Sequence, residues 1–354
     1  MEIENNPDVS TQRNHGIDIL KFFCAFLVLL GHTGYPGKIY IDPFVRIAVP
    51  VFFMVTGFFY EKTASRGKCI KQIKKVLIII AISDVLYVLK DLFTCIVIDH
   101  TTIREALICS LPVSFKDWIG FIFFNESKIS GHLWYLYAIL YVLVLFLILN
   151  KKKNIRSFYP LIPILLIFNF IMGNYCGVIF HYTVPLIFSR NFLFVGVPFF
   201  LLGHWIYTHY NHKQNNIVLA ALLLLTCITV SAENIFLLNS PVKGNWDCFI
   251  STPFTAYFVF LLVINNKNIF ENKVCRTIAN WGGKYSLFVY ILHPLIKPFI
   301  RKGLKIIKLY DEGNILSALS ILILTFAASA FCGFIFLSIK NAICKRKKRS
   351  KRNA

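Results

Sequence analysis

The chain has 354 residues, of which 56% are hydrophobic and only 16% charged, and its net charge is +21. This composition excludes an ordinary water-soluble surface and indicates a chain that lies largely in lipid. Apolar runs of roughly 17 to 25 residues recur, each long enough to cross a hydrocarbon core as a helix, whereas barrel strands alternate polar and apolar residues. We therefore predict an all-α, polytopic integral membrane bundle of about ten transmembrane helices.

In chain order, we predict a polar N-terminal segment (1–13), a membrane domain (14–340) and a basic cytoplasmic tail (341–354). No small-residue cleavage pattern follows the first apolar run, so it is expected to be a retained helix and not a signal peptide. Two further stretches are not counted among the spans: 103–124 could be a re-entrant or interfacial segment, and 174–189 is an apolar stretch broken by His181 and Pro185. The predicted spans are 16–33, 44–60, 73–93, 132–150, 158–172, 191–208, 216–232, 249–265, 284–300 and 314–340.

Lys and Arg residues favour a cytoplasmic N-terminus, because that orientation places most of them in cytoplasmic loops. One loop on the outer side departs from this bias, since basic residues from Lys297 to Lys308 share one face of an amphipathic helix. This helix could rest on anionic headgroups or offer a basic surface to an anionic acceptor. The cysteines lie in or beside apolar runs without paired spacing, which is typical of small buried hydrophobes, and no metal site is expected.

Ionisable groups inside hydrocarbon are costly and need a partner, a water-filled cavity or a function. The first span contains three, Asp18, Lys21 and His32. In a helix, His32 differs from Lys21 by about 20° and from Asp18 by about 40° around the axis, so all three form one stripe. Lys21 and His32 are separated by roughly 16 Å along the axis, so only an elongated ligand could touch both. Alternatively, Asp18 and Lys21 form a simple surface ion pair and His32 is interfacial.

Further polar residues far apart in the sequence are all predicted near the outer leaflet. Arg46 precedes the second span, His132 and Trp134 open the fourth, Arg190 opens the sixth, and His293 ends the ninth. Trp134 is also typical of an interfacial aromatic belt. Together with His32, these side chains are candidates for one site.

Five segments of the chain form a recognisable series: GIDILK (16–21), VPVFFMVTGF (49–58), HLWY (132–135), PFFLLG (198–203) and YSLFVYILHP (285–294). In this order they resemble the landmarks of the acyltransferase family 3 membrane proteins of bacteria. A basic residue, Lys21, is followed after ten positions by His32, as in the signature of that family, which usually has arginine at the first position. Lysine keeps the charge but loses the bidentate grip on phosphate.

The resemblance implies a multi-pass protein of the bacterial cytoplasmic membrane that transfers an acyl group, usually acetyl from cytoplasmic acetyl-CoA, to a hydroxyl of a cell-envelope carbohydrate or related acceptor. His32 would then be catalytic, with Asp18 as a second candidate. Lys21, Arg46 and Arg190 would bind the acyl-CoA donor, and His132, Trp134 and His293 the acceptor. An imidazole can act as general base or as nucleophile, and both routes remain open.

The same residues resemble the membrane half of vancomycin-resistance serine racemases. The chain ends soon after its last span, so we expect no pyridoxal-phosphate domain and no racemase activity of its own. It could instead be the membrane subunit of a split racemase system that handles or transports L-serine. Internal repeats, which would favour an unrelated transporter, are not evident. Expected partners are acyl-CoA, an envelope glycan and the bilayer, with homo-oligomers or envelope-assembly proteins as further options and no nucleic acid.

Overall fold

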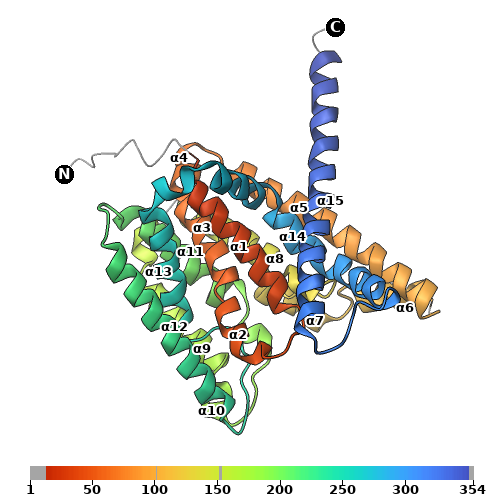
Figure 1. Cartoon of the computed structure of the whole chain (residues 1–354), viewed down its shortest axis with the longest axis horizontal. Helices are drawn as coiled ribbons and strands as arrows, with labels where there is room; N and C mark the ends of the chain where they lie inside the picture. Colours follow the sequence, from red (N-terminus) through yellow and green to blue (C-terminus); the bar gives the residue numbers. More distant parts are fainter. Residues whose placement is uncertain (1–12, 101, 151–153, 351–354) are drawn as a thin grey trace. The chain divides into compact units, whose positions relative to one another are not determined.

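The computed structural model describes residues 13–100, 102–150 and 154–350, and within these ranges it contains helices and connecting turns but no strand (Figure 1). The predicted all-α class is confirmed. Six helical stretches among the described residues are long and apolar enough to cross a membrane, and Thr252–Asn265 is a shorter apolar helix. The number of spans and the cytoplasmic N-terminus remain predictions. The six stretches are Lys38–Ser65, Gly131–Leu149, Ile155–Met172, Phe192–His209, Asn216–Leu238 and Ile315–Lys345.

Each predicted span coincides with a helix or with two consecutive helices. The second is divided into α2 and α3, and Pro50 lies in the first turn of α3, where a missing backbone N–H costs nothing. The first begins at Asn14, whose side chain caps the helix by accepting from the Ile17 N–H at 3.1 Å. The helices are α1 (His15–Gly31), α2 (Lys38–Val45), α3 (Ala48–Phe58), α5 (Cys69–Phe93), α8 (Trp134–Leu149), α9 (Leu161–Met172), α11 (Val197–His209), α12 (Asn216–Leu238), α13 (Thr252–Asn265), α14 (Lys273–Ile306) and α15 (Ile315–Ser350).

The two stretches not counted among the predicted spans are built from short elements. The first contains α6 (Ile103–Ser110) and α7 (Phe115–Phe124), which start with capping boxes at Thr102 and Ser114. Lys128 and Ser114 bind Asp117 and hold the pKa of its carboxyl well below the usual range. With 8 and 10 residues, these helices are too short to cross a bilayer. The stretch 174–189 contains only α10 (Cys176–Phe180) and a 3₁₀ turn.

The chain forms two compact units. The central unit comprises Val49–Asn265, and the terminal unit comprises Asn14–Ala48 with the described part of Asn266–Ala354. The predicted membrane domain 14–340 includes both units. Of the predicted N-terminal segment only Arg13 is described, and the last residues of the predicted tail, 351–354, also lie outside the described residues.

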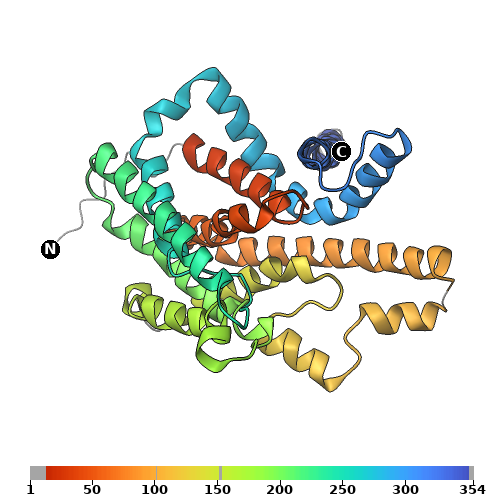
Figure 2. The ribbon, with the colours of Figure 1, turned by 60° about the horizontal axis from the view of Figure 1, so that its bottom comes forward.

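In the central unit, neighbouring helices have the relative directions expected of a chain that crosses a membrane back and forth. The long orange helix α5 of Figure 2 runs antiparallel to α8, because Asp84 contacts Tyr137 while Tyr87 contacts His132. Helices α12 and α13 are also antiparallel. By contrast, α3 and α11, which would be two even-numbered spans, run in the same direction, because Phe53 lies beside Gly196 while Glu61, eight residues on, lies beside His204.

The contact between α3 and α11 depends on glycine. A Cβ atom at Gly57 would lie 1.9 Å from the carbonyl oxygen of Phe200, and one at Gly203 would lie 2.0 Å from that of Met54. Only hydrogen at these positions permits such close backbones, as in other small-residue contacts between membrane helices. The same contact places Glu61, just beyond α3, beside His204 of α11.

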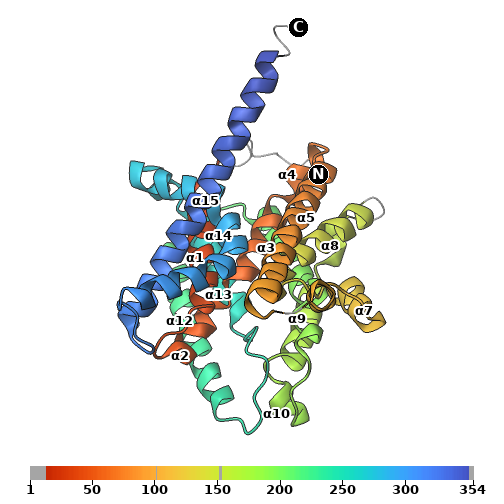
Figure 3. The same cartoon turned by 90° about the vertical axis from the view of Figure 1, so that its right-hand side faces the viewer.

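In the terminal unit, α14 lies along α1 and α15 returns antiparallel to α14 (Figure 3). A Cβ at Gly282 would lie 1.9 Å from the carbonyl oxygen of Asp18, so backbones touch here too. Further along, His293 reaches His32, which shows that α1 and α14 run in the same direction. The predicted amphipathic basic segment forms the last turns of α14, where Arg301 pairs with Glu312.

We expect Gly57→Ala to destabilise the protein by about 1–3 kcal/mol, because the new methyl group would meet backbone that cannot move aside. Gly131→Ala is the matched control, since nothing lies within 4 Å of a Cβ there. Thermal unfolding of the two detergent-purified variants, followed by size-exclusion chromatography, measures the difference. Equal unfolding temperatures would contradict the proposed backbone contact.

Candidate functional site

The polar stripe of α1 begins with an ion pair. Lys21 Nζ donates to Asp18 Oδ1 at 2.9 Å, one helical turn away, and Asp18 is buried where Gly282 packs against its backbone. The pairing corresponds to the simpler alternative drawn from the sequence. It also means that a phosphate of the expected acyl-CoA donor, if bound at Lys21, would share the ammonium group with Asp18. Donor binding by Lys21 and catalysis by Asp18 remain predictions.

Two histidines meet where α1 ends. The ring centroids of His32 and His293 lie 5.0 Å apart with the planes inclined by 34°. His293 is fully buried, whereas His32, the C-terminal cap residue of α1, is exposed. His293 faces α1 because it follows Gly282 and Val289 at intervals of eleven and four residues, which keeps all three on one side of α14.

The hydrogen bond of His293 indicates which ring nitrogen carries the proton. Nδ1 lies 3.0 Å from the carbonyl oxygen of Val289, which can only accept, so Nδ1 carries the proton. In the neutral ring, Nε2 then holds the basic lone pair. The His32–His293 pair thus combines an exposed imidazole with a buried one of fixed orientation.

Two lysines surround the same helix end. Lys297 of α14 donates to the carbonyl oxygen of His32, and Lys38 of α2 donates to the carbonyl oxygens of Gly31 and Thr33. The last carbonyl groups of a helix lack intrahelical partners and carry partial negative charge, so both ammonium groups stabilise the end of α1. They also give the surroundings of His32 a positive potential, which suits an anionic ligand.

Arg46 lies in the terminal unit with the histidine pair. Its guanidinium lies 3.8 Å from Asp42, and Lys38 reaches the same carboxylate at 3.8 Å from the other side. Helix α2 packs against the end of α1, where a Cβ at Gly31 would lie 2.9 Å from Val45. The terminal unit therefore holds five of the predicted site residues: Asp18, Lys21, His32, Arg46 and His293.

The other three predicted site residues belong to the central unit. Arg190 donates to Asp247 through Nη2 at 2.7 Å and Nε at 3.0 Å, and its guanidinium lies 5.9 Å from the Trp134 ring centroid. His132 Nδ1 lies 2.7 Å from Ser130 Oγ, and its ring meets Tyr87. Because Asp247 already balances its charge, Arg190 could bind an oxyanion only in competition with this carboxylate. The roles of these three residues remain predictions.

The structure also reveals ionisable groups with hydrogen-bond partners that the sequence analysis did not single out: buried His204, exposed Glu61 and half-buried Asp84. His204 Nε2 lies 3.1 Å from Glu61 Oε2, and its Nδ1 lies 2.7 Å from the Tyr159 hydroxyl. Asp84 accepts from the Tyr137 hydroxyl at 2.6 Å. Each lies in or beside an apolar run, so the cost of such groups in hydrocarbon was the signal that could have identified them.

Glu233, which is half-buried near the end of α12, is another ionisable residue that the sequence analysis did not single out. It accepts from the backbone N–H groups of Ile250 and Ser251 and from the hydroxyls of Ser251 and Tyr175. These four donors fix the turn before α13 and account for the carboxylate as a structural group. Across the described ranges, no cluster of three His, Cys, Asp or Glu residues could hold a metal ion.

Comparison with known proteins identifies the family. The model of a family described as an acyltransferase domain matches residues 14–334. Two curated relatives from Enterococcus faecalis, both described as amino-acid racemases, are 23% identical over 92% of this chain and 28% identical over 59% of it. These matches cover 46% and 30% of the relatives, so the chain spans less than half of their length. No solved structure gives a significant match. Because the family model covers most of the chain, the protein belongs to the acyltransferase 3 family of membrane proteins.

Proposed function

We propose that the protein is an integral membrane O-acyltransferase that moves an acyl group, most simply acetyl, from cytoplasmic acyl-CoA to a hydroxyl of an envelope carbohydrate or related acceptor. The observation that carries the proposal is the His32–His293 pair at the end of α1, with rings 5.0 Å apart. Family membership supports an acyltransferase-type activity. The identities of the acyl donor and of the acceptor go beyond family membership and are part of the proposal.

In the direct route, His32 accepts the proton of the acceptor hydroxyl while the oxygen attacks the thioester carbonyl carbon. The carbon–sulfur bond then breaks, and the imidazolium gives its proton to the departing CoA thiolate, which leaves as the thiol. In the two-step route, His32 attacks the thioester carbon and the carbon–sulfur bond breaks, so that CoA leaves as thiolate and the imidazole carries the acyl group. The acceptor hydroxyl then attacks this acyl group, the bond to the imidazole breaks, and the hydroxyl proton passes to the thiolate or to water. His293, with Nδ1 bound to Val289, can orient the His32 ring in both routes.

The lysines at the end of α1 would help to stabilise charge in the transition state. Lys38 and Lys297 bind carbonyl oxygens around His32, so their charges lie next to the exposed imidazole. A tetrahedral intermediate carries an oxyanion, and fixed positive groups lower its energy without reorganisation. Lys21, lower on the same helix, would contact the donor's phosphates while remaining close to Asp18.

Replacement of His32 by alanine tests the proposed catalyst. We expect acyl transfer to fall about 10²- to 10⁴-fold, because the base or nucleophile is lost. The measurement is mass spectrometry of envelope glycans from cells that carry the wild type, the variant or no copy of the gene. His212→Ala, an exposed histidine in a loop, serves as control and should retain transfer. Unchanged acylation with His32→Ala would refute the catalytic role.

Lys21 distinguishes donor binding from a purely structural ion pair. Lys21→Arg keeps the charge next to Asp18, whereas Lys21→Met removes it. We expect the KM for acetyl-CoA to rise roughly tenfold in the methionine variant and to stay near the wild-type value in the arginine variant, which still offers a cation to phosphate. Kinetics in proteoliposomes measure both constants. A fall in kcat with unchanged KM would argue against donor contact.

The names of the two curated relatives favour a second candidate function. Since they are described as amino-acid racemases and the chain spans less than half of their length, the protein could handle L-serine for a separate racemase. In that case proteoliposomes would accumulate radiolabelled L-serine above the level of empty vesicles, and His32→Ala would leave acyl groups on envelope glycans unchanged. Absence of L-serine binding and uptake, with acyl transfer present, would exclude this candidate.

A further inference from the structure

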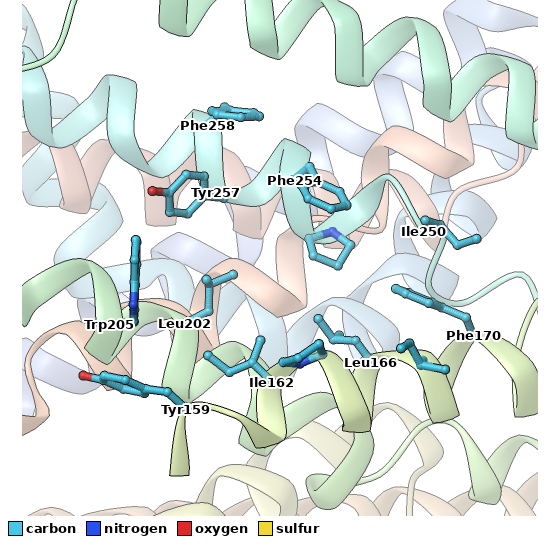
Figure 4. A pocket seen from close by; sticks show the side chains of 13 residues that line it. Tyr159, Ile162, Leu166, Phe170, Leu202, Trp205, Ile250, Phe254, Tyr257 and Phe258 are labelled. Carbon is cyan, nitrogen blue, oxygen red and sulfur yellow. The ribbon is translucent and has the colours of Figure 1, made fainter. Parts of the chain in front are cut away.

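The central unit contains an apolar pocket of about 640 Å³ between α9, α11 and α13 (Figure 4). This volume is within the range typical of small-molecule sites, about 300–1,000 Å³. The pocket opens to the surface of the helices, because Ile167 and Phe254 on its edge are 56% and 55% exposed. Its lining residues come from three segments of the chain: Tyr159–Phe170, Leu202–Trp205 and Ile250–Phe258.

Polar atoms gather at one end of this pocket. Tyr159, Trp205 and Tyr257 lie together on one side of the view in Figure 4, whereas Phe170 and Ile250 line the opposite end. The remaining lining side chains are aliphatic, aromatic or proline. An elongated ligand with an apolar chain and one polar end matches this division. Tyrosine and tryptophan carry a polar group on an apolar ring, which is why they are common where a membrane meets water.

The polar end is held in place by a chain of hydrogen bonds. The Tyr159 hydroxyl lies 2.7 Å from His204 Nδ1 and 2.9 Å from Thr208 Oγ1, and His204 Nε2 lies 3.1 Å from Glu61. His204 is 1% exposed, so its imidazole is fixed between the two partners. The Tyr159 ring therefore forms a rigid end wall. Neither the family resemblance nor the proposed acyl transfer uses this group.

Positive charge adjoins the same end. Arg156 lies in a 3₁₀ turn, Ile155–Phe158, that Asn154 caps by accepting the Arg156 N–H at 3.0 Å. Side chains three residues apart eclipse in such a turn, which places Arg156 and Tyr159 on the same face. The charge of Arg156 acts on both Tyr159 and Glu61, and the side chain is exposed.

We propose that this pocket binds one acyl chain of an anionic phospholipid, with the phosphate at Arg156 and the chain along α9 and α13. A hydrocarbon chain suits the apolar lining, and the exposed edge permits entry from the bilayer. An anionic head complements the exposed Arg156, because basic side chains at a membrane surface attract anionic lipids. The proposal is independent of the acyl transfer assigned to the terminal unit.

Matched tryptophan substitutions on α9 test the position of the chain. Ile162→Trp fills the pocket, whereas Ile164→Trp changes a residue of the same helix that is 59% exposed and does not line it. Native mass spectrometry counts the lipids that remain after purification from membranes containing equal amounts of phosphatidylglycerol and phosphatidylethanolamine. We expect the wild type and Ile164→Trp to retain one phosphatidylglycerol that Ile162→Trp loses. Equal retention by both variants would overturn the site.

A second pair of variants tests the head group and leaves the apolar pocket intact. We expect Arg156→Gln to lower the ratio of bound phosphatidylglycerol to phosphatidylethanolamine about fivefold, the factor that one basic group near anionic lipid contributes. Lys213→Gln, another exposed basic residue of the central unit, should leave the ratio unchanged. A wild type without preference for phosphatidylglycerol, or an equal effect of both substitutions, would refute the proposal.

Discussion

The rest of the structure depends on one constraint: a polar group inside an apolar helical bundle must find its partner within the protein. Asp18 pairs with Lys21, Asp84 with Tyr137, and His204 with Glu61 and Tyr159. Water cannot satisfy such groups in hydrocarbon, so the pairs between different segments, Asp84–Tyr137 and His204–Glu61, restrict which helix faces can meet. The Asp18–Lys21 pair lies within α1 and is satisfied locally. Together with the glycine contacts, which need the backbones to touch, these pairs give each unit a defined arrangement of helices.

At the end of α1, the need of polar groups for partners brings two lysines next to the pair of histidines. The orphan carbonyls of the helix terminus receive Lys38 and Lys297, and these lysines bring positive charge to His32. His293 is buried with Nδ1 on the Val289 carbonyl, which leaves its ring fixed against His32. A helix end that had to be capped thus becomes a place where an imidazole pair and two cations meet. This coincidence supports the proposed acyl transfer more strongly than any single residue does.

Prediction from sequence was accurate where the interactions are local. Long apolar runs place the helices because a helix alone satisfies its backbone in lipid. The Asp18–Lys21 pair, one of the alternatives drawn from the sequence, lies one turn apart, so helical spacing is sufficient to bring the two together. The stretch 103–124, which could have been a re-entrant or interfacial segment, contains two helices too short to cross a bilayer.

The sequence by itself determined the all-α class, the positions of the helices and the polar stripe of α1, because all of these follow from composition and helical periodicity. Only the tertiary structure decided that His293 meets His32 and that Glu61, His204 and Tyr159 form one chain. Helices that are apolar all round give little indication of which face meets which neighbour, since lipid is as apolar as their side chains. Close backbone contacts at Gly57, Gly203 and Gly282 make that choice, and they become visible only when the helices are packed.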